Sequence, residues 1–169
     1  MHHLILSDSF REFLSQAREY CFFIETNKPA NARLYLLDLQ LILQKLYMYG
    51  QKIEQVELIH NGDFDFTLDK TETHKLQKFV AKGLDESRYY WHVFDPSQDY
   101  DVDPVCGDLG DDLLDIYKDI KPALLLYDIG GEVEIEAAFW NMKFNFDNHW
   151  GEHCINAIYA IHYFIKRVD

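Results

Sequence analysis

The chain has 169 residues, of which 48% are hydrophobic and 15% aromatic, and a formal net charge of −13. Length and composition predict one folded domain over residues 1–169 and exclude a disordered chain. The excess of carboxylates excludes general binding to nucleic-acid phosphates, which needs clustered lysine and arginine.

Cysteine use and hydropathy bear on where the protein acts. Cys21, Cys106 and Cys154 cannot all pair with one another, and none forms a Cys-x-x-Cys motif, so we expect small core residues in a reducing compartment. No secretory signal is visible at the start, and polar residues interrupt the most apolar stretch, 34–49. The sequence therefore predicts a cytoplasmic protein that does not bind membranes.

Apolar residues at helical spacing predict the elements of the first half of the chain. We expect a helix over about 10–26, a second over about 31–49 that stops at Gly50, and a third from about residue 71 to Tyr90. Residues 51–70 between them are expected to be an irregular connection, with a short hairpin as the alternative. The inward face of the second helix is expected to include Leu34, Leu37 and Leu41.

Three further helices are predicted in the second half. Asp108 is a good N-cap for a helix that runs to about Tyr127 and stops at Gly130-Gly131. Residues 132–147 alternate in character, as in a strand, but their length and the spacing of their apolar residues favour a helix. A last helix follows over about 148–168, so the predicted fold is an all-α, single-domain bundle of five or six helices.

Aspartate is concentrated between Asp95 and Asp119, a stretch that holds nine aspartates and one lysine. On the predicted helix from Asp108, four of them form a stripe opposite the apolar one. Three causes remain open: a solvated surface, a cation or basic group held against the stripe, or burial with hydrogen-bonded partners. The stripe consists of Asp108, Asp112, Asp115 and Asp119.

The preceding aspartates imitate the first half of a calcium-binding loop. Asp99, Asp101 and Asp103 have the spacing of its first three ligands. However, Pro104 stands where an EF-hand needs glycine, and Gly110 where it needs a bidentate glutamate. The sequence therefore excludes an EF-hand and leaves another kind of calcium site as an alternative.

Two histidines are the strongest candidate metal ligands outside the stripe. His149 and His153 are four residues apart, so they lie on one face of the last helix and can share a metal. Ala157 and Ala160 continue that face, which also fits buried, hydrogen-bonded histidines. The candidate metal set is Asp112, Asp115, Asp119, His149 and His153.

Aromatic residues form two groups in the sequence, around Tyr90-Trp91 and around Trp140 and Trp150. We expect core layers, with a ligand cavity lined by Tyr90, Trp91, Trp140 and Trp150 as the alternative. His162 is expected to lie in the core.

Three stretches carry a resemblance. They are YYWHVFDP (89–96), PVCGDLGDDLLDIYKDIKPALLLYD (104–128) and AAFWNMKFNFDNHWGEHCINAIYAIH (137–162). Together they resemble an uncharacterised bacterial family of all-helical domains of unknown function. The resemblance covers roughly the last half of the chain. It implies an all-α fold and carries no activity, cofactor or catalytic residue.

The favoured hypothesis is a non-catalytic, acidic helical domain that binds a basic protein partner, including an immunity-type role against a basic toxin. It needs no cofactor, and it requires Asp112, Asp115 and Asp119 to be exposed. The alternative is a metal-dependent hydrolase in which these aspartates, with His149 and His153, hold a divalent ion. The sequence leaves the oligomeric state open.

Overall fold

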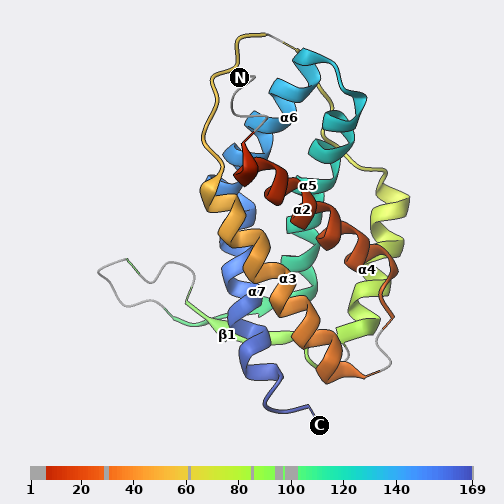
Figure 1. Ribbon diagram of the computed structural model, residues 1–169. Helices are drawn as coiled ribbons and strands as arrows, with labels where there is room; N and C mark the ends of the chain where they lie inside the picture. Colours follow the sequence, from red (N-terminus) through yellow and green to blue (C-terminus); the bar gives the residue numbers. More distant parts are fainter. Residues whose placement is uncertain are drawn as a thin grey trace.

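The computed structural model describes residues 7–28, 31–60, 62–84, 86–93, 97 and 103–168. Within these ranges the chain is a helical bundle with a two-stranded sheet at one end, which confirms the predicted all-α fold (Figure 1). The elements in chain order are α2 (Asp8–Thr26), α3 (Ala32–Lys52), α4 (Lys70–Leu84), β1 (Tyr89–His92), β2 (Val105–Asp108), α5 (Leu109–Ile129), α6 (Glu132–Asn145), the π-helical turn η1 (Phe146–Trp150) and α7 (Gly151–Phe164).

The bundle is built around α5, which packs against α6 and α7, while α3 packs against α7 and α2 (Figure 1). Helix α2 crosses the others obliquely and buries Phe10 and Phe13 against Phe139 and Trp150. Helix α4 lies at the edge of the bundle, where only its Val80 and Leu84 are buried. Because α4 packs so lightly, space remains between it and α5.

Helix ends follow local chemistry that the sequence displays. The Asp108 side chain accepts a hydrogen bond from the Gly110 N–H at 2.9 Å, which confirms the predicted cap of α5. Gly130 ends that helix in the left-handed region, at φ 82°, which a glycine adopts without a Cβ penalty. The prediction that the second helix stops at Gly50 is wrong, because α3 continues to Lys52.

The end of the third predicted helix is also wrong. Helix α4 stops at Leu84, and Tyr89–His92 form the strand β1, which pairs antiparallel with β2 so that Tyr90 lies opposite Gly107. Two tyrosines and a tryptophan in succession favour extended chain, and the alternate exposure of β1 fits a strand better than a helix. Residues 53–60 and 62–69, between α3 and α4, are irregular, as expected.

Residues 132–164 form one continuous helical run, so the preference for a helix over 132–147 is confirmed and the predicted break near residue 148 is wrong. At η1 the Gly151 N–H reaches back to the Phe146 carbonyl, five residues earlier, which is the hydrogen bond of a π-helical turn. A Cβ at Gly151 would collide with that carbonyl oxygen, so this position requires glycine.

Several side chains lie elsewhere than expected. Leu34 and Leu41 of α3 are exposed, and the helix instead buries a neighbouring stripe that includes Leu39, Leu43 and Leu46. His162 is exposed rather than in the core. The three cysteines are free, and two of them are buried, but Cys106 is exposed. No helix in the described part of the chain is both long and apolar enough to span a bilayer.

Candidate functional site

The aspartate stripe of α5 faces η1 and α7. His153 Nδ1 lies 2.8 Å from Asp112 Oδ1, and His149 Nδ1 lies 2.7 Å from Asp119 Oδ2. These pairs run in opposite order along the two segments, so α5 and α7 are antiparallel here. The apolar stripe of α5, which includes Leu113, is buried as the spacing predicts.

Asp112 is the innermost residue of this cluster, with 6% of its surface exposed. Its second carboxylate oxygen accepts a hydrogen bond of 2.5 Å from the hydroxyl of Tyr90, which reaches it from β1. The Tyr90 ring lies over Gly107 on β2, where a Cβ would come within 2.5 Å of the ring. The hairpin therefore positions a phenol against a carboxylate that also holds a histidine.

Asp115 lies between the two histidines. Its Oδ2 is 3.7 Å from His153 Nε2, and its Oδ1 forms an ion pair of 2.7 Å with Lys118 Nζ. One ligand atom from each of Asp115, His149 and His153 lies within 4.8 Å of the others, which is close enough for the three residues to hold one metal ion together. We call these three residues, with Asp112 and Asp119, the His–Asp cluster.

Electrostatics in the cluster follow its geometry. The hydrogen bond to Asp112 raises the pKa of His153 above its usual value, against the opposing effect of burial. Burial raises the pKa of the Asp119 carboxyl above its usual value, and the hydrogen bond with His149 offsets only part of this rise. Burial and then the hydrogen bond to Asp112 raise the pKa of Tyr90, so its hydroxyl stays protonated and acts as the donor.

The structure thus brings together all five candidate metal residues, but in two positions. Asp112 and Asp119 each contact the Nδ1 atom of one histidine, while Asp115 lies between the two histidines. The partner hypothesis requires Asp112, Asp115 and Asp119 to be exposed. This prediction is wrong for Asp112, which is buried, while Asp115 and Asp119 are half-buried. Both histidines are hydrogen-bonded, but the alternative of buried histidines is wrong for His149, which is exposed, and His153 is half-buried.

The four aromatic candidates do not line one cavity. Trp150 is fully buried in the core, where Phe13 stacks on it. Trp140 stacks on Phe144 at a centroid distance of 4.6 Å, and Trp91 on β1 is 67% exposed. Tyr90 belongs to the His–Asp cluster through its hydroxyl.

One buried carboxylate was not anticipated from the sequence. Glu136 on α6 is fully buried and accepts hydrogen bonds from the Ile59 and His60 backbone N–H groups and from His60 Nδ1. Burial alone raises the pKa of its carboxyl, but the hydrogen bonds outweigh this effect and the pKa falls below its usual value. The glutamate fastens the irregular connection to α6, and nothing in the spacing of residues 132–136 indicates this.

Of the aspartates that imitate a calcium loop, only Asp103 lies within the described residues, and it is exposed. Asp99 and Asp101 lie outside them. Phe94, Asp95 and Pro96, at the end of the first stretch that carries the resemblance, lie outside them too.

Comparison with known proteins places this fold in a family. A crystal structure of protein BF1032 from Bacteroides fragilis is similar, with a TM-score of 0.81 and 22% sequence identity over 94% of this chain and 93% of that chain. No curated protein matches the chain. The profile described as Domain of unknown function (DUF5063) matches residues 5–166, well beyond the half of the chain that carries the resemblance. The chain belongs to the DUF5063 family, whose function is unassigned.

Proposed function

We propose that the protein binds a divalent metal ion through the Nε2 atoms of His149 and His153 and a carboxylate oxygen of Asp115. The observation that carries this proposal is that the Nδ1 atom of each histidine lies against a carboxylate. A carboxylate only accepts hydrogen bonds, so each Nδ1 must carry the proton. In the neutral imidazole, each Nε2 atom then carries the lone pair that a metal accepts.

Asp112 and Asp119 have a separate role in this proposal. Metal-binding histidines commonly donate their second N–H to a carboxylate, which fixes the ring and raises its basicity. Tyr90 extends this support by one step, because it holds the Asp112 carboxylate from the other side.

The distances fit a small movement on binding. Ligand atoms about 2.1 Å from a tetrahedral zinc ion lie about 3.4 Å from one another. His153 Nε2 and Asp115 Oδ2 are already 3.7 Å apart, and one ligand atom from each of the three residues lies within 4.8 Å of the others. Because His149 is exposed, its side chain can shift to complete the contraction.

Two imidazoles and one carboxylate suit zinc and the neighbouring divalent transition metals. Three protein ligands leave a coordination position open, where a water or the acidic group of another molecule is held. The hydrolase hypothesis adds activation of that water to the same site.

Zinc titration by calorimetry, with protein purified without chelator, tests the proposal. Wild type is expected to bind one ion, and His149→Ala, His153→Ala and Asp115→Asn to lose at least tenfold in affinity. Saturation at 100 times the dissociation constant stabilises the fold by about 2.7 kcal/mol, so EDTA is expected to lower the melting temperature. His162→Ala is the matched control, because His162 is exposed further along the same helical run. Equal zinc binding by wild type and the cluster variants would contradict the proposal.

Binding to a basic protein partner is the second candidate, supported by the net charge of −13 and by exposed carboxylates such as Asp111 and Asp103. Such binding is expected to weaken steeply as ionic strength rises from 0.05 to about 0.5 M, because exposed charges are screened. A cytoplasmic location is part of the same proposal and is supported by the three free cysteines.

A further inference from the structure

A cavity of about 540 Å³ lies between α4 and α5 and borders the His–Asp cluster. Asp119 on α5 belongs to both, and its neighbour Lys118 contacts both. Each lines the cavity, while Lys118 pairs with Asp115 and Asp119 with His149. The light packing of α4 leaves this space, and its volume lies in the range of small-molecule sites, about 300–1,000 Å³.

The lining of this cavity has the opposite charge balance to the chain. Lys70 and Lys118 face one carboxylate, Asp119, in a protein with a net charge of −13. His74 adds an imidazole that can donate a hydrogen bond. The Asp119 carboxylate is already engaged by His149 and the Lys118 ammonium by Asp115, so Lys70 is the lysine of this lining that has no partner among the described residues.

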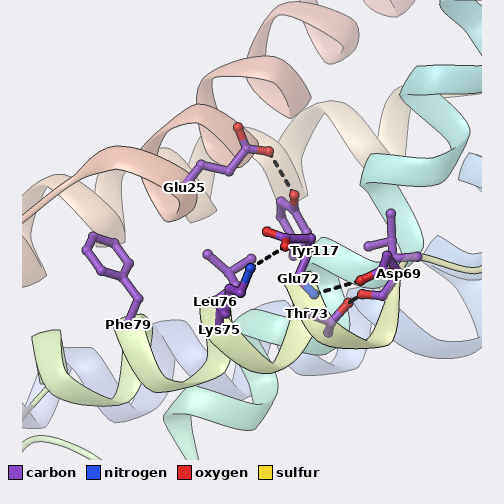
Figure 2. Close-up of a pocket in the computed structure, with 9 residues that line it drawn as sticks. Glu25, Asp69, Glu72, Thr73, Lys75, Leu76, Phe79 and Tyr117 are labelled. Carbon is purple, nitrogen blue, oxygen red and sulfur yellow. Dashed lines mark hydrogen bonds and ion pairs between the residues drawn. The ribbon is translucent and has the colours of Figure 1, made fainter.

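A neighbouring cavity of about 600 Å³ serves as a contrast (Figure 2). Its carboxylates are satisfied by the chain itself. Glu25 accepts a hydrogen bond from Tyr117, and Glu72 pairs with Lys75. Asp69 accepts backbone N–H groups at the start of α4. This second cavity is larger but acidic, and it does not include a residue of the His–Asp cluster.

We propose that the cavity between α4 and α5 binds a small organic anion, with its carboxylate or phosphate group at Lys70 and Lys118. The apolar part of the anion then packs against Phe66, Leu68 and Leu114, which form the apolar side of the lining. This inference deepens the proposed function, because it names the class of molecule that the metal site serves. It rests on that function in one respect: a divalent ion beside Asp119 adds positive charge and strengthens anion binding.

Benzoate and phenyl phosphate are suitable probes, and benzamide is the neutral control of the same shape. Backbone amide shifts of Thr73, His74 and Gln77, followed by NMR during titration, report on the cavity. Benzoate or phenyl phosphate is expected to shift them saturably, and benzamide is not. Which of the two anions binds more tightly identifies the acidic group.

The Lys70→Gln/Lys118→Gln double variant is expected to bind the anion at least tenfold more weakly, and Lys75→Gln in the neighbouring cavity is the matched control. Lysine-dependent binding to metal-free protein would uphold the cavity even if zinc failed to bind. Zinc binding without any anion effect would uphold the metal site and overturn the cavity. Benzamide binding as well as benzoate, undiminished binding by the double variant whose circular dichroism is unchanged, or no shift with any probe would overturn the inference.

Discussion

Tyr90→Phe removes one hydroxyl from the support of the His–Asp cluster. That hydroxyl donates 2.5 Å to a carboxylate of which only 6% is exposed, so little water is present to replace it. A hydrogen bond to a charged group contributes about 1.5–3 kcal/mol, and the lost donor leaves Asp112 Oδ2 unsatisfied. We therefore expect the free energy of unfolding to fall by about 2 kcal/mol. Loss of a residue that positions a metal ligand through hydrogen bonds typically lowers metal affinity by about 10–100-fold.

Urea denaturation at neutral pH measures the first effect and zinc calorimetry the second. Tyr89→Phe is the matched control, because Tyr89 is the adjacent strand residue and is exposed. It is expected to leave both quantities within about 0.5 kcal/mol of wild type, as surface substitutions usually do. If Tyr90→Phe matched this control in both assays, the hydrogen bond to Asp112 would have no energetic role and the reasoning would fail. Lower stability with unchanged zinc affinity would limit Tyr90 to a structural role.

Two other substitutions test packing and pH dependence. Gly50→Ala places a Cβ about 2.6 Å from the Trp150 ring. Overpacking of this kind costs about 1–3 kcal/mol, which exceeds the gain of up to about 1 kcal/mol in helix propensity. Thermal denaturation should therefore show a less stable protein, and a more stable one would contradict this reasoning. Glu136→Gln removes a carboxylate whose pKa is lowered in the folded state from the usual 4.5, so its stabilisation is present above pH 4.5 and is lost as pH falls through the folded pKa. The stability gap between wild type and this variant should therefore be full at neutral pH and narrow below pH 4.5; a gap independent of pH would refute the assignment.

Features encoded by neighbouring residues could be predicted from the sequence. The Asp108 cap, the Gly130 stop and the buried stripe of α5 each depend on chemistry within a few positions of the chain. The inward face of α3 could not be predicted. Leucine or isoleucine occupies so many positions of this helix that several different faces are equally apolar. Its neighbours α2 and α7 decide which stripe is buried.

The candidate site shows the same division. The spacing of His149 and His153 and the stripe of α5 were visible, but their mutual contact depends on how α5 packs on α7. Tyr90 was visible as an aromatic residue, but its contact with Asp112 depends on a strand that helical spacing had concealed. Long-range pairs such as Glu136 with the amides of residues 59 and 60 leave no local signal at all.

The π-helical turn at η1 sets the rotation of everything after it. An extra residue in one turn advances the following helix by about 100° relative to an uninterrupted α-helix. Residues 132–145 and 151–164 can therefore each direct their own apolar side inward although they belong to one continuous helical run. Deleting a single residue there would restore ordinary winding and rotate the imidazole of His153 away from Asp112 and Asp115, so the length of the chain in this segment matters to the cluster as much as the identity of its residues.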